Sequence, residues 1–259
     1  MKIELDIRKT IEENAARYFE ESKKAKGKID AVRAIIEKSK LELERLEEKE
    51  LEVEKKEVVE KREKKWFEKF RWFISSEGFL CIGGRDATSN EIVIKKHTDP
   101  SDIVFHTEMS GSPFFVVKSE GKPIGEITLN EVGIATASFS RAWKQGIGYL
   151  DVFYVNPDQV SKEAKSGEYI AKGAFMIYGK KNIIRAEPGL AIGKTEEGMW
   201  MCGPRGAVHA LCKEYYIVRQ GKDRPSDIAK MLVKKHGGDS DEIIRCMPAG
   251  TSRVSKATN

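Results

Sequence analysis

The sequence has few cysteines and no long apolar run, and both absences narrow the class of protein. Its 259 residues include four cysteines, with no Cys-x-x-Cys pair among them: Cys81, Cys202, Cys212 and Cys246. Such sparse cysteines exclude a disulfide scaffold or a zinc ribbon, so we expect reduced thiols in an intracellular protein. No apolar run reaches the length of about 18 residues that a membrane span needs, and the charged N-terminus is unlike a signal peptide. We therefore expect a soluble, cytoplasmic protein.

The residue patterns of hydrolases and metalloenzymes are also lacking. Neither Ser138 nor Ser140 lies in a Gly-x-Ser-x-Gly motif, and no Gly-Lys-Ser/Thr sequence completes a phosphate-binding loop. The histidines have no spacing typical of metal ligands: His97, His106, His209 and His236. We therefore predict a protein that is not an enzyme and that holds no metal or other cofactor.

Charged residues, in contrast, are abundant. They make up 34% of the chain, against about a quarter in a typical domain. Lys and Arg number 46 and Asp and Glu 41, which leaves a net charge of +5. This mildly basic balance is compatible with nucleic-acid binding but does not by itself indicate it. The apolar fraction of 40% is enough for a buried core in one or two domains.

The N-terminal part of the chain has the pattern of a coiled coil. Residues 8 to 64 contain no proline and one glycine, and apolar or small residues recur at spacings of three and four. The members of this seam are Ile11, Ala15, Tyr18, Ser22, Ala25, Ile29, Val32, Ile36, Ser39, Leu43, Leu46 and Val53. A lone helix cannot bury the seam, so its partner is the returning segment 51–70, a second copy of the chain or another protein. No Gly, Pro or Asn turn lies between residues 45 and 65, which disfavours the returning segment.

From Trp66 onward, glycine becomes frequent and short β-branched runs appear. These runs predict strands at Phe79–Ile82, Glu91–Lys95, Ile103–His106, Phe114–Lys118, Leu150–Val155 and Phe175–Tyr178. We predict one helix over Leu129–Trp143, with Thr128 as N-cap and Glu131 as its capping-box partner, and a short helix over 158–165.

The tail is expected to form a small unit of its own. Helices are predicted over Pro204–Tyr215 and Ser226–His236, with a strand at Tyr216–Arg219 between them, while residues 252–259 are expected to fray. The fold class is therefore α+β. It comprises a coiled coil (1–65), a mixed α+β domain (66–195) and a C-terminal α/β extension (196–259).

Two local features at the start of the domain have more than one interpretation. The aromatic cluster of Trp66, Phe67, Phe70, Trp72 and Phe73 is either a hinge that docks the helix or a platform on which RNA bases stack; its spacing favours the hinge. The Gly-Gly-Arg-Asp sequence at 83–86 is either a phosphate-binding turn or a hairpin turn with an Arg–Asp pair.

Basic residues recur in several loops of the domain, between aromatic residues and glycines. If the fold brings them to one face, they form a surface that follows a phosphate backbone; if they are dispersed, they only solvate the protein. The candidate RNA-binding residues are Arg85, Lys95, Lys96, His97, His106, Arg141, Lys144, Lys162, Lys172, Lys180 and Lys181, and Arg185 follows the same pattern.

Several long segments resemble the RNA-binding NFACT-R domain of the NFACT family. They are KKWFEKFRWFISSEGFLCIGGRDATSNEIVIKKH, DIVFHTEMSGSPFFVVK, ASFSRAWKQG and NPDQVSKEAKSGEYIAKGAFMIYGKKN. The segment ENAARYFEESKKAKGKI is similar to the coiled coil before this domain in archaeal-type members, and GPRGAVHALCKEYYIVRQGKDRPSDIAK to their C-terminal extension. NFACT proteins are ribosome-associated quality control factors that were long described as fibronectin-binding.

The resemblance implies contact with the ribosome. Full-length members bind the large subunit while it carries peptidyl-tRNA, contact tRNA and ribosomal RNA, and in several lineages promote non-templated tailing of the stalled peptide. They carry an N-terminal domain and a helix-hairpin-helix segment before the coiled coil. This sequence has neither, so we expect either a natural short form or a cut-down C-terminal portion of such a protein. The start within coiled-coil sequence favours the second, and we do not expect this chain to support tailing alone. The family's tRNA-directed Asp-Arg motif lies in that N-terminal domain and is not transferred to Arg85-Asp86.

Two hypotheses of different classes follow. The first is a non-enzymatic module that binds large-subunit RNA and tRNA, with a protein partner or a second copy on the coiled coil. The second is a protein–protein scaffold whose basic residues only solvate it. An enzyme acting on nucleic acid would need converging acid, base or metal-ligating residues, and the sequence shows no such set.

Overall fold

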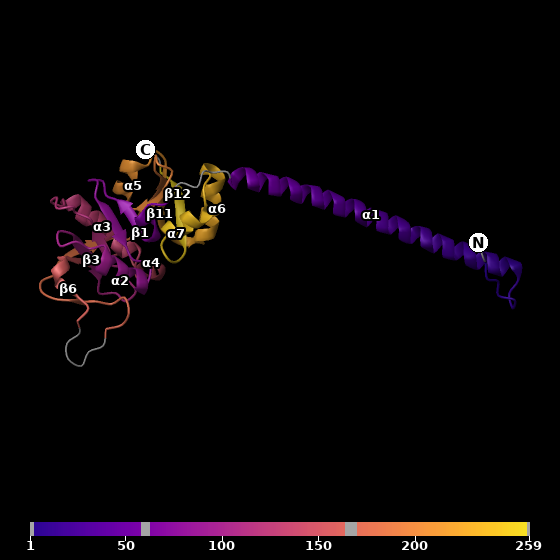
Figure 1. The fold of residues 1–259 in the computed structure, drawn as a ribbon, viewed down its shortest axis with the longest axis horizontal. Helices are drawn as coiled ribbons and strands as arrows, with labels where there is room; N and C mark the ends of the chain where they lie inside the picture. Colours follow the sequence, from indigo (N-terminus) through magenta and orange to yellow (C-terminus); the bar gives the residue numbers. More distant parts are fainter. Residues whose placement is uncertain (1–2, 58–62, 164–169, 258–259) are drawn as a thin grey trace. The chain divides into compact units, whose positions relative to one another are not determined.

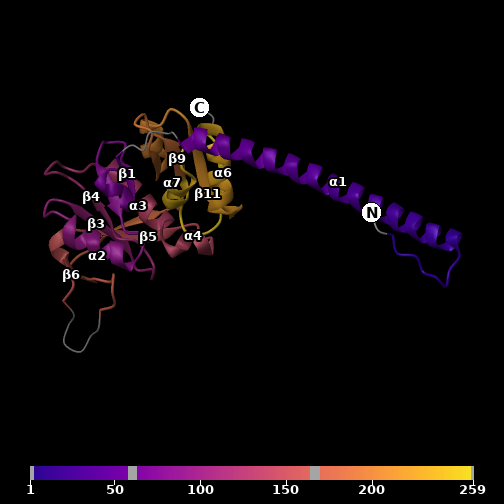
Figure 2. The ribbon, with the colours of Figure 1, turned by 45° about the vertical axis from the view of Figure 1, so that its right-hand side comes forward.

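The computed structural model describes residues 3–57, 63–163 and 170–257. Backbone contacts divide the chain into two compact units, Met1–Glu63 and Lys64–Asn259. The first unit consists of a short segment and one helix, α1 (Ile11–Glu57), drawn in Figures 1 and 2. A capping box starts α1: Glu13 N donates to Thr10 Oγ1 at 3.1 Å, and Thr10 N donates to Glu13 Oε2 at 2.8 Å.

The apolar seam of α1 is exposed within this unit. Ile29, Val32 and Ile36 are 53%, 54% and 47% exposed. Because α1 continues as a helix through Glu57, residues 51–57 do not turn back along it. The prediction that a returning segment covers the seam is therefore wrong for these residues. Residues 58–62, and the side chains of Leu46 and Val53, lie outside the described residues. The coiled coil itself stays a prediction.

A six-stranded antiparallel sheet forms the centre of the second unit. The strand order is β1–β2–β4–β3–β5–β8. The strands are β1 (Arg71–Ile74), β2 (Leu80–Gly83), β3 (Ile103–Thr107), β4 (Phe115–Val117), β5 (Leu150–Val155) and β8 (Asn182–Ala186). This mixture of antiparallel sheet and helices, after one long helix, confirms the predicted α+β class.

Helices cover the two faces of this sheet unequally. On one face, α3 (Glu126–Ser138) packs closely: a Cβ built at Gly133 would lie 3.4 Å from the side chain of Ile184. On the other face lies α2 (Ala87–Lys96), where Asn90 Oδ1 accepts a hydrogen bond from Phe114 N at 3.1 Å. This second face stays open at β5 and β8, since Ile183 on β8 is 69% exposed.

A second sheet, of four antiparallel strands, forms the C-terminal part of the unit. Its order is β10–β9–β11–β12. Its elements are β9 (Leu190–Lys194), β10 (Trp200–Gly203), β11 (Tyr215–Asp223), β12 (Ser252–Lys256), α5 (Arg205–Leu211), α6 (Pro225–His236) and α7 (Ser240–Cys246). The two sheets share one core, because Gly203 packs on Phe73 so closely that a Cβ there would lie 2.8 Å from the Phe73 Cβ. The β9–β10 hairpin crosses the expected boundary at 195/196; the division into 66–195 and 196–259 stays a prediction.

The strand predicted at Glu91–Lys95 is wrong, because these residues belong to α2. The β-branched run of Ile92, Val93 and Ile94 suggested a strand, but β propensity depends strongly on context. Asp86 caps the helix instead, accepting a hydrogen bond from Ser89 N at 2.8 Å. The interpretation of 83–86 as a hairpin turn is also wrong, because this segment leads from β2 into α2 and not into a second strand.

The long helix predicted over Leu129–Trp143 is also corrected. α3 begins at Glu126 after Gly125 and ends at Ser138, and a second short helix, α4 (Arg141–Gln145), starts after Ser140. Thr128 is therefore not the N-cap. The carboxylate of Glu131 accepts from Ser76 N at 2.9 Å rather than closing a capping box.

Smaller corrections concern the ends of elements. Residues 157–159 form a 3-10 turn, η2 (Pro157–Gln159), followed by β6 (Val160–Ser161), not a helix; residues 164–165 lie outside the described residues. The strand predicted at Phe175–Tyr178 shortens to β7 (Met176–Ile177). The helix predicted to Tyr215 ends at Leu211, and α6 is capped at Arg224 rather than Ser226. Residues 252–256 form β12 and do not fray.

The aromatic cluster is not a single helical face. Trp66–Lys69 form the 3-10 turn η1, and Trp72 and Phe73 belong to β1. All of its members except Trp66, which is 48% exposed, are buried in the core. That they set the angle of the preceding helix stays a prediction.

All four cysteines are free thiols. Among the described residues, no helix combines the length and apolar character that crossing a membrane requires.

Candidate nucleic-acid interface

Lys162 fixes the hairpin formed by β6 and β7. Its ammonium lies 2.7 Å from Glu91 Oε1 on α2 and donates to the carbonyls of Ala171 and Ala174 at 3.0 and 2.9 Å. Gly173 N donates to the same Glu91 oxygen at 3.2 Å. These hydrogen bonds, that of Lys162 first, lower the pKa of Glu91 to about 2. Lys162 therefore holds the hairpin against α2, and its charge is already matched by a carboxylate.

Three other candidate lysines of this region face solvent. Lys95 on α2 lies 3.8 Å from the second oxygen of Glu91. Lys172 and Lys180 are exposed, and neither forms an ion pair within the parts of the chain that the structure describes. Lys172 and Lys180 are thus cations available to an anionic ligand.

The backbone turn before Lys180 is well defined. Gly179 has φ of 78°, a conformation that favours glycine. The side-chain amide of Gln159 donates to the carbonyls of Tyr178 and Lys180 at 2.8 and 3.1 Å. Lys180 therefore projects from a braced turn.

A row of aromatic rings connects the hairpin to the open part of the sheet. Successive ring centroids lie 5.3, 4.0 and 6.0 Å apart. The rings, in order, are Phe175, Phe114, His106 and Phe153. The ammonium of Lys162 lies 5.0 Å from the first ring and that of Lys181 4.6 Å from the last. Lys181 also pairs with Glu108, so both of these lysines cap the row rather than extend freely into solvent.

His106 lies inside this row as a neutral residue. Its ring stacks on Phe114, and Nε2 lies 3.2 Å from the carbonyl oxygen of Ser112. Because a carbonyl only accepts, Nε2 carries the proton of the neutral ring. Burial lowers the pKa of His106 to about 4. His106 therefore carries no charge at neutral pH to attract a phosphate.

Beyond the row, the outer surface of β5 and β8 mixes aromatic, aliphatic and cationic side chains. Asp151 pairs with Arg185 and Phe153 with Ile183 across the two strands, so residues two apart share this face. We call it the open face and define it by Tyr149, Lys181, Ile183 and Arg185. Tyr149 is 57% and Ile183 69% exposed, and the guanidinium of Arg185 lies 5.3 Å from the Tyr149 ring.

Arg85 lies elsewhere, at the C-terminal end of α7. Its guanidinium donates to the carbonyl of Arg245, while Arg71 donates to the carbonyl of Met247 at 3.1 Å. Two arginines thus satisfy carbonyls at or beside a helix C-terminus. Burial lowers the pKa of Arg85, and that of Arg71 to about 10. Gly83 and Gly84 serve packing, since a Cβ at either would lie under 3 Å from Phe115 or Asn90.

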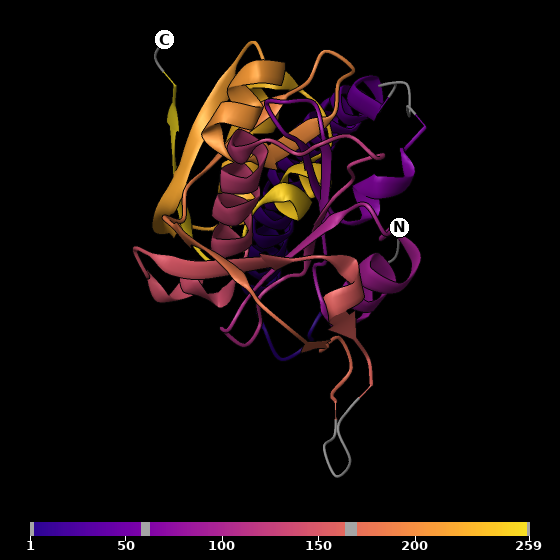
Figure 3. The same ribbon diagram turned by 90° about the vertical axis from the view of Figure 1, so that its left-hand side faces the viewer.

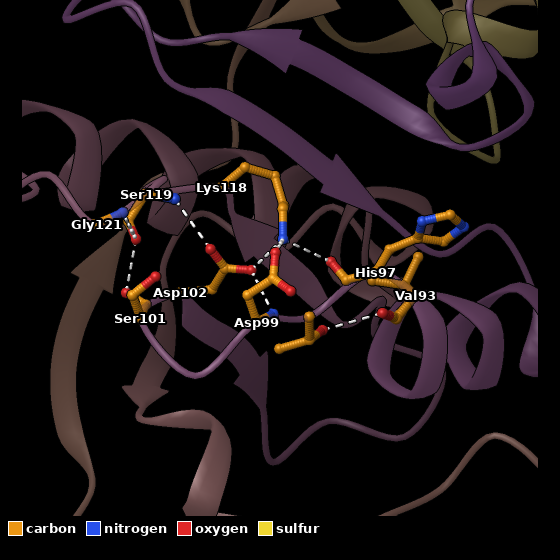
Figure 4. Close-up of polar contacts among 9 residues, drawn as sticks. Val93, His97, Asp99, Ser101, Asp102, Lys118, Ser119 and Gly121 are labelled. Atoms are coloured by element: carbon orange, nitrogen blue, oxygen red, sulfur yellow. Dashed lines mark hydrogen bonds and ion pairs between the residues drawn. The ribbon is translucent and has the colours of Figure 1, made fainter.

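Lys96 and His97 lie at the other end of α2. The His97 ring stacks on Trp66 at 4.6 Å, and burial, with Lys69, Lys118 and Lys96 nearby, lowers its pKa. Next to it, Lys118 contacts Asp99 at 2.6 Å, Asp102, and the carbonyl of His97 at 3.1 Å (Figure 4). This network, centred on the buried carboxylate of Asp102, fixes the loop after α2.

Arg141 and Lys144 lie on the short helix α4, and both are exposed. No described contact joins them to the hairpin or the open face. The structure thus joins Lys95, Lys162, Lys172, Lys180, Lys181 and Arg185 in one region, with the neutral His106 in the aromatic row between them, and places the other candidates outside it. Sequence reasoning missed Tyr149 and Ile183; the alternation of Lys181, Ile183 and Arg185 was the available signal.

A partly open sheet that presents aromatic and cationic side chains is a type of surface on which nucleic-acid-binding domains stack bases and hold phosphates. Residues 69–179 match the family model described as the NFACT protein RNA binding domain. Residues 1–66 match the model for the NFACT N-terminal and middle domains. The chain therefore belongs to the NFACT family.

Proteins with related sequences have names that refer to ribosome quality control. The archaeal Rqc2 homolog aRqcH of Methanocaldococcus jannaschii is 39% identical over 203 residues, which are 76% of this chain and 30% of that protein. The human ribosome quality control complex subunit NEMF is 39% identical over 174 residues, 66% of this chain and 16% of that protein. The chain thus spans less than a third of either relative. The solved C-terminal part of the fibronectin/fibrinogen-binding protein of Streptococcus suis matches 50% of this chain and 49% of that one, with a TM-score of 0.40 and 16% identity.

Proposed function

We propose that the chain is an RNA-binding module of a ribosome-associated quality control factor, which contacts large-subunit RNA and peptidyl-tRNA on stalled, split subunits in the cytoplasm. One observation supports this most directly. Within or just after the residues that match the RNA-binding domain, a row of aromatic rings connects two lysines that have no ion pair among the described residues to exposed apolar and cationic side chains of the open face. Lys172, Lys180 and Arg185 supply the charge, and Tyr149 and Ile183 the apolar contact.

The proposed mechanism is positional rather than catalytic. Exposed cations neutralise phosphates and release counterions, which gives affinity without sequence specificity. The ring of Tyr149 can stack on a base, and Ile183 beside it can pack on a base or a ribose. Lys162 and Lys181, which are paired with carboxylates, hold the hairpin and the aromatic row in place for these contacts.

A protein-binding role for α1 is the second candidate. Ile29, Val32 and Ile36 expose an apolar seam that a coiled-coil partner would cover. The partner would be a second copy of the chain or another protein. This role is compatible with RNA binding by the second unit, because the two functions use different residues.

Co-sedimentation of the full chain with purified large ribosomal subunits tests the proposal. We expect binding that weakens as salt rises and that is stronger when peptidyl-tRNA occupies the subunit. Absence of binding at every salt concentration would contradict it. Binding that is constant between 50 and 300 mM salt would favour the scaffold, because phosphate contacts give a steep salt dependence.

A further inference from the structure

In the C-terminal sheet, two arginines lie directly opposite each other. The register of β11 and β12 pairs Arg219 with Arg253, and both side chains are exposed. Directly opposed residues of an antiparallel pair have Cβ atoms about 4.5–5.5 Å apart on the same face, and like charges in this position are destabilising. Figure 3 shows the two strands, orange and yellow, beside the C-terminus. An anion bound between the two guanidinium groups would relieve this repulsion.

Among the described residues, no carboxylate forms an ion pair with these arginines. Across residues 63–163 and 170–257, neither Arg219 nor Arg253 forms an ion pair, and the same holds for the neighbouring exposed cations Lys222 and Arg224. Asp223 is the acidic residue among them in sequence. The bulged end of the β11–β12 pair therefore gathers four cationic side chains, with one acidic side chain, Asp223, among them.

The backbone holds this cluster rigidly. On the opposite side of β11, the Gln220 amide donates to the carbonyls of Ala142 and Ile147 at 3.3 and 3.1 Å. Gln220 and Asp223 both face Ser252, which marks a β-bulge, a feature that re-aims side chains. A Cβ at Gly221 would lie 2.5 Å from Arg253 N, so glycine is needed for the close approach of the strands.

We propose that the end of the β11–β12 pair is a second RNA-phosphate site, in which Arg219 and Arg253 converge on one phosphodiester group and Lys222 and Arg224 contact its neighbours. The site goes beyond the function proposed above, because all four residues lie outside residues 69–179, which match the RNA-binding domain. Guanidinium groups match phosphate oxygens in a bidentate manner, which favours a phosphodiester ligand. Neither strand exposes a large apolar side chain, so nothing here would insert into a lipid surface.

The test measures RNA affinity of the full chain by fluorescence anisotropy, with a labelled tRNA and a large-subunit RNA fragment, at several salt concentrations. The variant is Arg219→Gln with Arg253→Gln. Its matched control is Lys230→Gln with Lys234→Gln, two exposed cations of α6 with the same change in charge. We expect the arginine variant to bind about tenfold more weakly, with a salt slope smaller by about 2, and the control to bind like the wild type. The arginine variant should melt at the same or a higher temperature, since it removes a repulsive pair.

Equal losses in the arginine variant and the control would overturn the proposal, because the effect would then be one of net charge. Wild-type affinity in the arginine variant would overturn it as well. The variant Lys172→Gln with Lys180→Gln, measured in parallel, tests the RNA surface proposed above. If this variant loses affinity and the arginine variant does not, only the second site is wrong. Poly-glutamate or anionic vesicles that compete as well as RNA of equal charge would show that the cluster binds another polyanion.

Discussion

The lysines of the second unit have different roles, which the sequence around each of them does not reveal. Lys118 and Lys162 each contact a carboxylate and backbone carbonyls, whereas Lys172 and Lys180 have no ion pair among the described residues. Burial alone would lower the pKa of Lys118. Hydrogen bonds to Asp102 and Asp99 outweigh that effect, so the pKa is raised. The paired lysines stabilise the fold, and the unpaired ones are left for a ligand.

Replacement of Lys118 by alanine is expected to destabilise the second unit by about 3 kcal/mol, because the side chain of Asp102, 1% exposed, would lose its cation. Chemical denaturation of the full chain measures this. Lys122→Ala, an exposed lysine of the following loop, is the control and should change the free energy of unfolding by less than about 0.5 kcal/mol. Equal effects of the two substitutions would show that the network of Figure 4 is not stabilising.

His106 should make stability depend on pH. Its folded pKa of about 4 lies below the ordinary value of 6.5, so the unfolded chain binds the proton more readily. The contribution of neutral His106 to the free energy of unfolding is fully present above pH 6.5 and is lost as the pH falls toward 4. Between pH 7.5 and pH 5, this loss is about 2 kcal/mol. We therefore expect the difference in unfolding free energy between wild type and His106→Gln to decrease by about 2 kcal/mol when the pH is lowered from 7.5 to 5. A difference that is constant with pH would contradict the buried, neutral state.

At the scale of elements, residues 87–96 form the helix α2, in agreement with the cap at Asp86 and against the strand preference of the β-branched residues in its middle. Asp86 accepts from Ser89 N, and Ser89 Oγ in turn accepts from Asp86 N at 2.9 Å. These reciprocal bonds start a helix on the turn that follows β2. The helix then places Glu91 where it meets Lys162, so the cap also positions the β6–β7 hairpin.

Asp86→Ala should cost about 1 kcal/mol of stability, as removal of a helix cap does. Asp86→Asn should cost less, since an asparagine oxygen accepts the same hydrogen bond. Thermal unfolding of the two variants and the wild type distinguishes them. If asparagine were as harmful as alanine, the charge of Asp86 rather than its capping oxygen would be what matters.

The strands β2, β3, β4 and β5 could be predicted because short apolar runs mark them. α2 could not be, since Ile92, Val93 and Ile94 favour strands and only the spacing of Asp86 and Ser89 indicated a cap. For the candidate site, the sequence supplied the cations but not their pairing. Glu91 lies far along the chain from Lys162, and which lysine it neutralises is decided by how α2 packs on the hairpin. Tyr149 and Ile183 become a surface only because α3 covers the opposite side of their strands.

At the scale of the whole molecule, the chain joins a charged helix with an exposed apolar seam to a unit that contains the matched RNA-binding domain. The helix offers a seam for a protein partner, and the second unit offers the open face and the free lysines of the hairpin. The proposed RNA contacts and the proposed partner contacts therefore use separate units of the chain.

The central claim is that Lys172, Lys180 and Arg185 contact RNA phosphates. The most direct test compares the full chain with the variant in which all three are glutamine, by titration with labelled tRNA between 50 and 200 mM salt. The control replaces Lys122, Lys230 and Lys234, three exposed lysines away from the open face. We predict a salt slope smaller by about 3, with affinity at least tenfold lower, for the first variant and a nearly unchanged slope for the control. Wild-type slope and affinity in the first variant, with its fold intact, would contradict the claim.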